Sequence, residues 1–386
     1  MAHFDFDRVI ERRNSGCMKW DTKSAQGLLP LWVADMDFEA APAIVEALQR
    51  RIGHGVYGYT EIPAAYYEAI VNWQLKRNSL KIKAGDIIPV PGVVAALTAV
   101  IQALSLPGDQ LIMQTPAYNC FYSCTRNSGL ELLRNPLRYT DGRFEADFEQ
   151  LSHLASQERA RLLLLCNPHN PSGRLWSREE LLKFGTIARD HQLIVISDEI
   201  HSDVRPNDSH FISFGSIARE LGLRCVILNS PSKPFNLAGL RNAYIIADDR
   251  ELYERINRQV NINEICDLNP FGVIGLIEAY EHSADWLYAV NDYIQGNYAF
   301  MKGYIAEQIP TLRTVPLEAT YLSFIDCRGT GLADLQLNHT IRREGRVMLS
   351  PGIMYGEEGS GFMRLNLACS RTVLTQALEG IKKALV

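Results

Sequence analysis

Lys233 stands in a turn after an apolar, strand-like run, where its amine could act as a nucleophile or a base. The stretch 228–244 reads LNSPSKPFNLAGLRNAY, with Ser230 and Ser232 directly before the lysine. Pro234 disfavours helical backbone at the lysine, so the strand is expected to end in a turn there. Most lysines in turns are solvated and carry no chemistry, so this stretch alone leaves both interpretations open.

Four other polar clusters follow short apolar runs in the same way. Helical stretches such as 93–104 and 178–192 separate several of these runs, and the alternation predicts a doubly wound, mostly parallel α/β sheet. In such sheets ligands bind beyond the carboxyl ends of the strands, so all five clusters are expected on one rim. The four clusters are Pro91–Val94 after 87–90, Thr115–Tyr118 after 109–114, Asn167–Gly173 after 162–166 and Asp198–His201 after 193–197.

The residues expected at this rim are suited to a phosphate and an aldehyde. A helix that opens at Gly92 would present free backbone N–H groups and a positive dipole end, which bind phosphate. Ser230 and Ser232 add hydroxyl donors, and Arg241 adds a guanidinium. Neither the NTPase P-loop pattern nor the dinucleotide-binding glycine pattern is present. A phosphate beside Lys233 suggests pyridoxal phosphate (PLP), whose aldehyde would form a Schiff base with the lysine.

Three further side chains then acquire roles at the cofactor ring. Asp198 could keep the pyridine nitrogen protonated, so that the ring accepts electrons; Asn170 could donate to the ring hydroxyl, and Tyr118 could stack on the ring. Each has an ordinary alternative, namely a helix N-cap, a turn-forming asparagine and a partly buried aromatic residue. Their joint occurrence on successive strand ends favours the cofactor site.

Composition narrows the function classes. The 386 residues are 47% hydrophobic and carry a net charge of −5, with no long basic run to support nucleic-acid or anionic-membrane binding. Eight cysteines without a C-x-x-C pair, and a charged N-terminus without an apolar signal core, predict a reduced, cytoplasmic setting. No apolar run approaches the roughly 20 residues that span a bilayer.

Three segments are expected along the chain. Residues 46–285 contain the alternating strands and helices and form a large cofactor-binding domain. Residues 286–386 begin with a long helical stretch and continue with strand-like runs, which predicts a smaller α+β domain. Residues 1–45 are expected to pack with that small domain.

The polar clusters resemble those of fold-type I PLP enzymes, the aminotransferase class I/II superfamily. The matching motifs are Asn167-Pro-x-Asn170-Pro-x-Gly173, Asp198-x-x-His201, Ser230-x-Ser232-Lys233 and Gly239-x-Arg241, in the family's order over nearly the whole chain. A finer resemblance is to the MalY/PatB branch, the cystathionine β-lyase-like C–S lyases. It is carried by MKWD (18–21), WVADMDF (32–38), HGVYGYT (54–60), SDEIH (197–201), SKPFNLAGL (232–240) and SPGIMYGEEGSGFMRLN (350–366).

The resemblance implies fold type I, with a mostly parallel seven-stranded sheet, and a role for each matching residue. Lys233 would be the Schiff-base lysine, Asp198 would face the pyridine nitrogen, and Tyr118 would stack on the ring, as the three catalytic residues. Arg364 would hold the substrate carboxylate, beside Val33, Tyr118 and Asn170, and no metal is implied. The other cofactor contacts would be Gly92, Val93, Val94, Asn167, Asn170, His201, Ser230, Ser232 and Arg241, with Tyr59 supplied by the neighbouring subunit of a homodimer.

The implied activity is α,β-elimination of L-cystathionine or cysteine S-conjugates to thiol, pyruvate and ammonia. An aminotransferase is the alternative, because Arg241 fits the phosphate arginine of ordinary aminotransferases. His201 replaces a tyrosine that many aminotransferases have, and this favours the lyase branch. Proteins of the MalY type can also bind a transcriptional regulator, so a regulatory partner follows from the resemblance alone.

Overall fold

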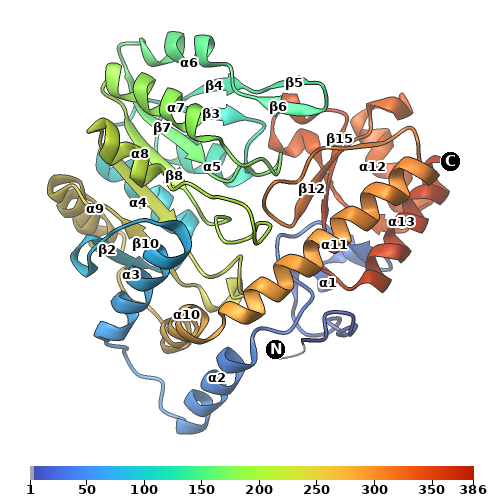
Figure 1. Cartoon of the computed structure of the whole chain (residues 1–386), viewed down its shortest axis with the longest axis horizontal. Coiled ribbons are helices and arrows are strands. Elements are labelled where there is room, and N and C mark those ends of the chain that lie inside the picture. The colour runs from blue at the N-terminus through green and yellow to red at the C-terminus, as the bar shows by residue number, and fades with distance from the viewer. Residues whose placement is uncertain (1–3) are drawn as a thin grey trace.

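A seven-stranded β-sheet organises the larger part of the molecule. The computed structural model describes residues 4–386, and Figure 1 shows helices on both sides of this sheet. It contains β2 (Ile87–Val90), β3 (Gln110–Thr115), β4 (Glu131–Pro136), β7 (Ala160–Cys166), β8 (Ile194–Asp198), β9 (Cys225–Asn229) and β10 (Ala243–Ile246). The order is β2-β10-β9-β8-β7-β3-β4, with β10 antiparallel to both neighbours and the other pairs parallel. The predicted fold class, α/β with a mostly parallel seven-stranded sheet, is therefore confirmed.

Two hydrophobic cores lie against the opposite faces of this sheet. Along β7, Leu162 and Leu164 point into one core, while Leu163 and Leu165 point into the other. Because both faces are covered, the strands are continuous apolar runs rather than alternating ones. One core is covered by α4 (Val93–Leu104), α5 (Asn119–Asn127) and α9 (Arg250–Ile262). The other is covered by α3 (Ala64–Asn78), α6 (Phe148–Ala155), α7 (Arg178–Asp190), α8 (Phe214–Leu221) and α10 (Pro270–His282).

Strand β4 is a strand of this sheet that the search for apolar runs did not identify. Its sequence, ELLRNP, alternates exposed and buried positions, because β4 lies at the edge of the sheet. Charged side chains at Glu131 and Arg134 and the terminal Pro136 are typical of an edge strand. A search for continuous apolar runs therefore misses it.

Several helices around the sheet begin at a capping side chain. Ser177 accepts from the backbone N–H of Glu180 at the start of α7, and Asp249 and Asn269 accept in the same way at α9 and α10. Helix α4 differs, because it begins after Gly92 and no side chain of residues 4–386 caps it. Its first backbone N–H groups are therefore left for another partner.

A smaller sheet forms from the C-terminal part of the chain. It contains β11 (Arg313–Thr314), β12 (Leu322–Asp326), β15 (Phe362–Asn366) and β14 (Ser350–Pro351), in that order and all antiparallel. The accompanying helices are α11 (Ala284–Gln308), α12 (Asp334–Arg343) and α13 (Arg371–Leu385), and a separate hairpin of β5 (Arg138–Thr140) and β6 (Arg143–Glu145) lies outside this sheet.

The N-terminal segment contacts the C-terminal part of the chain. Strand β1 (Leu29–Pro30) pairs in parallel with β13 (Val347–Met348), and the backbone N–H of Asp37 donates to the carbonyl of Ala368. In Figure 1 the blue α1 (Met18–Asp21) accordingly lies near the orange and red helices, whereas α2 (Pro42–His54) packs on α10. The division of the chain at residues 45/46 and 285/286 stays a prediction, and residues 1–3 of its first segment lie outside the described residues.

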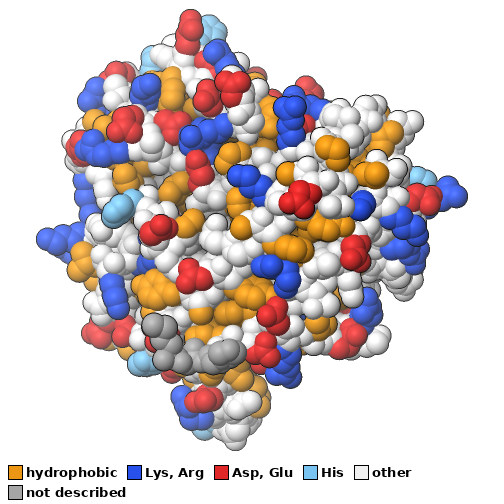
Figure 2. Space-filling model, turned by 45° about the vertical axis from the view of Figure 1, so that its right-hand side comes forward, with side chains coloured by type: hydrophobic (Ala, Val, Ile, Leu, Met, Phe, Trp, Pro, Cys, Tyr) orange, Lys and Arg blue, Asp and Glu red, His pale blue; other side chains and the backbone are white. Residues whose placement is uncertain are grey.

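The surface mixes both signs of charge. On the face shown in Figure 2, Lys and Arg side chains are interspersed with Asp and Glu rather than gathered by sign. None of the helices within residues 4–386 combines the length and apolar character needed to span a membrane.

Candidate active site

The loops after β2, β3, β7, β8 and β9 meet at one cavity of about 210 Å³. This convergence follows from the topology: β10 is antiparallel to both β2 and β9, so β2 points the same way as the other four strands. The structure thereby brings most of the predicted site residues together. Those that line the cavity are Gly92, Val93, Val94, Tyr118, Asn170, Asp198, His201, Ser230, Ser232, Lys233 and Arg241.

One end of the cavity is suited to an anion. The uncapped start of α4 opens onto it at Gly92 and Val93, and the exposed Arg241 lines it as well. The hydroxyl of Ser230 is already used within the protein, because it donates to the carbonyl of Asn242 (2.6 Å) and accepts from the backbone N–H of Ser232 (3.0 Å). Ser230 therefore holds the backbone at this end of the cavity in place. The positive charge there comes from the start of α4 and from Arg241.

Lys233 and Asp198 face the same cavity and are both shifted toward their neutral forms. Burial raises the pKa of Asp198 to about 7, although its carboxylate accepts a hydrogen bond from the backbone N–H of Ile200 (3.1 Å). Burial, together with the positive charge of Arg364, lowers the pKa of Lys233 to about 8. A cation beside Asp198 would restore its ionised form, and the lysine amine is available as a base near neutral pH.

Two buried polar groups of the cavity have no hydrogen-bond partner within residues 4–386. They are Nδ1 of His201 and Nδ2 of Asn242. Burial lowers the pKa of His201 well below its usual value, so this imidazole is neutral. Both nitrogens belong to residues that line the cavity, and an unpaired buried nitrogen is costly in free energy.

Arg364 adjoins the cavity from β15. Its guanidinium donates to Oδ1 of Asn170 (3.0 Å) and to the carbonyl of Trp32 (3.0 Å), and it lies over the ring of Tyr355. The contact with Asn170 leaves the amide N–H groups of that residue to donate to a bound molecule. Because Arg364 is buried and its Nε atom has no partner among the described residues, it is suited to bind a carboxylate.

Besides Arg364, which adjoins the cavity without lining it, three predicted residues do not line it. Asn167 is buried and its amide donates to the carbonyl of Ile212 instead. Val33 is adjacent to the cavity-lining Ala34, but its own carbonyl accepts from Asn366. Tyr59 is fully exposed and lies outside the cavity of its own chain. The roles predicted for these three residues stay predictions.

The structure also adds residues that sequence reasoning missed. The Lys233 amine donates to the carbonyl of Ala34 (2.7 Å), which lies 199 residues earlier in the chain. Asn242 lines the cavity, and its Oδ1 accepts from the hydroxyl of Tyr66 (2.8 Å). A signal for Asn242 existed, because it precedes an antiparallel strand, whose amino end lies at the same rim as the carboxyl ends of the others.

The residues present fit PLP. The start of α4 and Arg241 suit its phosphate, Asp198 suits a protonated ring nitrogen, and Lys233 suits its aldehyde. Tyr118 lines the cavity beside Phe121 and offers an aromatic face. These features were derived from separate observations and meet in one cavity of this chain.

Comparisons with known proteins agree with this geometry. The family model for aminotransferase class I and II matches residues 27–381. The chain is 39% identical over 385 residues to cystathionine beta-lyase PatB of Bacillus subtilis (strain 168), covering 99% of this chain and 100% of that one. It is 30% identical over 391 residues to protein MalY of Escherichia coli (strain K12), covering 99% of each. The crystal structure of cystalysin from Treponema denticola, which contains PLP, superimposes with a TM-score of 0.96 at 30% identity over 100% of this chain and 99% of that one.

Proposed function

Because the chain belongs to the aminotransferase class I and II family of PLP enzymes, we propose that it is a C–S β-lyase of the cystathionine β-lyase type. Its cofactor is PLP and its substrate is a small molecule. The observation that carries this proposal is the full-length identity of 39% to a cystathionine beta-lyase. The cavity supports it, since a shifted lysine, a buried carboxylate and an adjoining arginine lie where such chemistry needs them.

The substrate class is an L-amino acid with sulfur on its β-carbon. Arg364 binds the α-carboxylate through charge-assisted hydrogen bonds, with the amide of Asn170 beside it. This anchoring places the α-carbon near Lys233 and removes much of the entropic cost of bringing the reacting groups together.

PLP, when bound, supplies an electron sink that stabilises negative charge at the α-carbon of the substrate. Lys233 takes up the α-proton, since a pKa of about 8 leaves a useful fraction of its amine neutral near pH 7. With the cofactor bound, Asp198 would keep a proton on its ring nitrogen, and Tyr118 would offer its aromatic face to the ring. The β-carbon–sulfur bond then breaks with its electron pair on sulfur, so that substrate and one water give thiol, pyruvate and ammonia.

Incubation with L-cystathionine in the absence of an oxo acid tests this function. We expect thiol, pyruvate and ammonia in equal amounts from the wild-type protein and none from Lys233→Ala. Product that forms only when 2-oxoglutarate is added would reject the lyase.

An aminotransferase is the second candidate, and Arg241 is the observation that favours it. This arginine lies at the anion end of the cavity, as the phosphate arginine of ordinary aminotransferases does. Both activities would use Lys233, Asp198 and Arg364 for binding and proton removal, so the oxo-acid dependence described above separates them.

We also propose a homodimer in which Tyr59 reaches the phosphate site of the partner chain. Tyr59 is fully exposed, and the neighbouring Val56 and Tyr57 are more than half exposed, as expected for side chains that pack on another subunit. A cytoplasmic location and a regulatory partner stay predictions; the eight unpaired cysteines, all within the described residues, support the former.

Mixing two inactive variants tests the shared site. A dimer of one Lys233→Ala chain and one Tyr59→Ala chain contains one intact site only if Tyr59 serves the partner. We expect the equimolar mixture, after subunit exchange, to recover about a quarter of wild-type activity. No recovery would show that each site is built from one chain.

A further inference from the structure

Residues 32–38, here called the strap, form irregular backbone whose carbonyl groups are bound by side chains from distant parts of the chain. Every carbonyl from Trp32 to Met36, and that of Phe38, accepts at least one such hydrogen bond. The donors are Arg364 and Ser350 to Trp32, Asn366 to Val33 and Asp35, Lys233 and Tyr321 to Ala34, Arg12 and Asn236 to Met36, and Asn236 to Phe38.

Two of these donors are the residues that the proposed reaction needs most. Lys233 Nζ lies 2.7 Å from the carbonyl oxygen of Ala34, and Arg364 Nη2 lies 3.0 Å from that of Trp32. The two carbonyls are only two residues apart. The strap therefore connects the proposed base, on the loop after β9, with the proposed carboxylate clamp on β15.

An asparagine follows each of these two residues closely in the sequence, and its side chain hydrogen-bonds to the same strap. Asn236, three residues after Lys233, donates to the carbonyls of Met36 (3.1 Å) and Phe38 (2.9 Å) and accepts from the N–H of Met36 (3.0 Å). Asn366, two residues after Arg364, donates to the carbonyls of Val33 and Asp35, both at 2.6 Å. One asparagine thus ties the strap to the lysine loop and the other ties it to the arginine strand.

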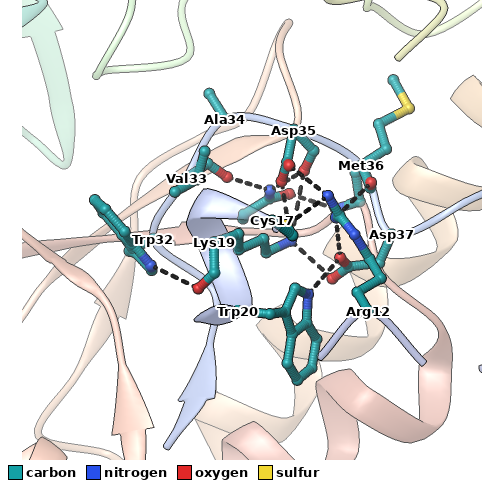
Figure 3. A network of polar contacts seen from close by, with 12 residues as sticks. Arg12, Cys17, Lys19, Trp20, Trp32, Val33, Ala34, Asp35, Met36 and Asp37 are labelled. Carbon is teal, nitrogen blue, oxygen red and sulfur yellow. Dashed lines mark hydrogen bonds and ion pairs between the residues drawn. The ribbon is translucent and has the colours of Figure 1, made fainter. Parts of the chain in front are cut away.

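Arg12, Lys19, Asp35 and Asp37 form a cluster of four charges that also holds the strap, with Lys19 and Asp37 buried and the other two partly buried (Figure 3). Lys19 is fully buried and lies 2.7 Å from Asp37 and 3.5 Å from Asp35. Arg12 lies 2.8 Å from Asp35 and 2.5 Å from Asp37, and Trp20 Nε1 donates to Asp37 (3.0 Å). None of the four charged residues lines the cavity, so the cofactor site does not explain the cluster.

We propose that the strap sets the position of Lys233 relative to Arg364. Asn236, Asn366 and the four-charge cluster are then positioning residues, which act on the reaction through the backbone carbonyls of the strap. This inference rests on the proposed function, in which one amino acid must reach Arg364 with its carboxylate and Lys233 with its α-proton.

The expected effect on catalysis follows from geometry. A displacement of about 1 Å between a bound substrate and a catalytic group lowers the rate by about 10²-fold. Loosening the strap should therefore raise KM, through Arg364, and lower kcat, through Lys233. A residue that only stabilises the fold would lower the melting temperature and leave both kinetic constants of the folded enzyme unchanged.

Asparagine variants of the holoenzyme test the proposal. Asn236 has a φ of 59°, which glycine adopts without strain, so Asn236→Gly removes the side chain and keeps the backbone. Asn366→Ala removes the other fastening. The matched control is Asn135→Ala, since Asn135 is also buried and donates to a backbone carbonyl, that of Asp147 (3.0 Å), but touches neither strap nor cavity.

All three variants should lose thermal stability, whereas only the two strap variants should change the kinetics. Measured well below the melting temperature, we expect kcat/KM to fall at least about 10-fold for each strap variant, with KM raised, and to stay near wild type for Asn135→Ala. Cofactor content should stay complete in all of them. Strap variants whose kcat and KM match those of the control overturn the proposal.

A second measurement does not depend on the reaction. The pH at which the visible absorption of the holoenzyme changes reports the proton on the Lys233 nitrogen. The charged or titratable groups near this nitrogen include Arg364, Asp35, Asp198, Cys120 and His201, together with the Tyr321 hydroxyl, which donates to the same carbonyl of Ala34. Asp35 is the one that belongs to the strap, and both Arg12 and Lys19 form ion pairs with it.

Opposite charge changes in the cluster should shift this midpoint in opposite directions. Asp35→Asn removes a negative charge and should lower it by about half a pH unit, and Lys19→Gln should raise it by a similar amount. The double variant should return it close to the wild-type value, which also controls for damage to the fold. Midpoints that do not move, or that move in one direction, overturn the proposal. If the wild type eliminates no thiol from cystathionine, the proposed function fails while this titration still reports whether the strap is coupled to Lys233.

Discussion

Two buried polar regions of the molecule lie side by side and are satisfied in different ways. In the four-charge cluster under the strap, each cation lies between 2.5 and 3.5 Å from the carboxylates of both Asp35 and Asp37. In the cavity, Asp198 and Lys233 are both shifted toward neutrality by burial. Charges that find their partners within the chain stabilise a local structure, whereas poorly compensated ones indicate a partner from outside it.

The same difference extends to the uncharged groups. The indole N–H of Trp20 reaches Asp37, and every carbonyl of the strap except that of Asp37 accepts from a side chain. In the cavity, by contrast, His201 and Asn242 each keep a buried nitrogen without a partner among the described residues. Because Oδ1 of Asp35 also lacks a hydrogen-bond partner among the described residues, the two regions differ chiefly in how their charges are paired.

The largest expected effect is that of Lys233→Ala, which tests the cavity side of the comparison. Without the amine, we expect elimination activity to fall by about 10⁴-fold and the visible absorption of the lysine-bound cofactor to disappear. Thermal unfolding, measured in parallel, shows that the variant is folded. Lys302→Ala on α11, an exposed lysine, is the control, and activity that survives in Lys233→Ala would reject the assignment of the base.

The next largest effect is expected from breaking the satisfied cluster. Lys19→Met leaves Asp35 and Asp37 buried with one cation between them, and we expect a loss of about 3–5 kcal/mol in the free energy of unfolding. Chemical denaturation at pH 7 measures it. A loss below about 1 kcal/mol would show that this cluster is no better paired than an exposed ion pair.

The pH dependence of the unfolding free energy should distinguish Asp198, the carboxylate in the cavity. With its pKa raised from 3.8 to about 7, Asp198 keeps a proton in the folded apoprotein that the unfolded chain has already lost. Its contribution to stability therefore falls as pH rises from about 4 to 7 and is constant above that range. Bound cofactor should reduce this fall, because a ring cation favours the ionised carboxylate.

Asp198→Asn isolates this effect. Relative to the wild-type apoprotein, the variant should gain up to about 4 kcal/mol of unfolding free energy between pH 4 and 7. The buried Glu199, whose pKa burial also raises to about 7, titrates in both proteins, and only the small part of its shift that comes from the Asp198 charge is lost in the variant. Denaturation curves at both ends of the range decide it, and parallel pH profiles for variant and wild type would contradict the assignment.

The smallest effect should come from an exposed pair, which provides the reference for both buried regions. Arg250 and Glu254 form an i,i+4 pair on α9 with both side chains more than half exposed. Glu254→Gln should change the unfolding free energy by no more than about 0.5 kcal/mol and leave the kinetics unchanged. A change as large as that of Lys19→Met would mean that burial does not explain the difference between the regions.

The sequence predicted much of the large sheet because the strands buried on both faces are continuous apolar runs. The same reasoning placed Lys233 and Asp198 on one rim, since the carboxyl ends of parallel strands lie together. Edge strand β4 was missed because its exposed positions carry charge.

The remaining parts of the site depend on contacts that no local pattern contains. The carbonyl of Ala34 reaches Lys233 across 199 residues, and it is a backbone group, which residue types do not reveal. Ser230 was expected to offer a hydroxyl donor, but packing directs that hydroxyl to the carbonyl of Asn242. Residue identity thus predicted which side chains gather, whereas packing decides which of their atoms remain available.

The first turn of α4, which no described side chain caps, should respond to cofactor binding. Its leading amides, from Val93 onward, have no capping side chain among residues 4–386, whereas α7 and α9 carry caps of their own. A phosphate seated there would complete the hydrogen bonding of the helix, so cofactor occupancy and local helix order are linked thermodynamically. Amide hydrogen exchange at this turn should slow when the cofactor binds and recover when it leaves, while the capped helices exchange at a constant rate.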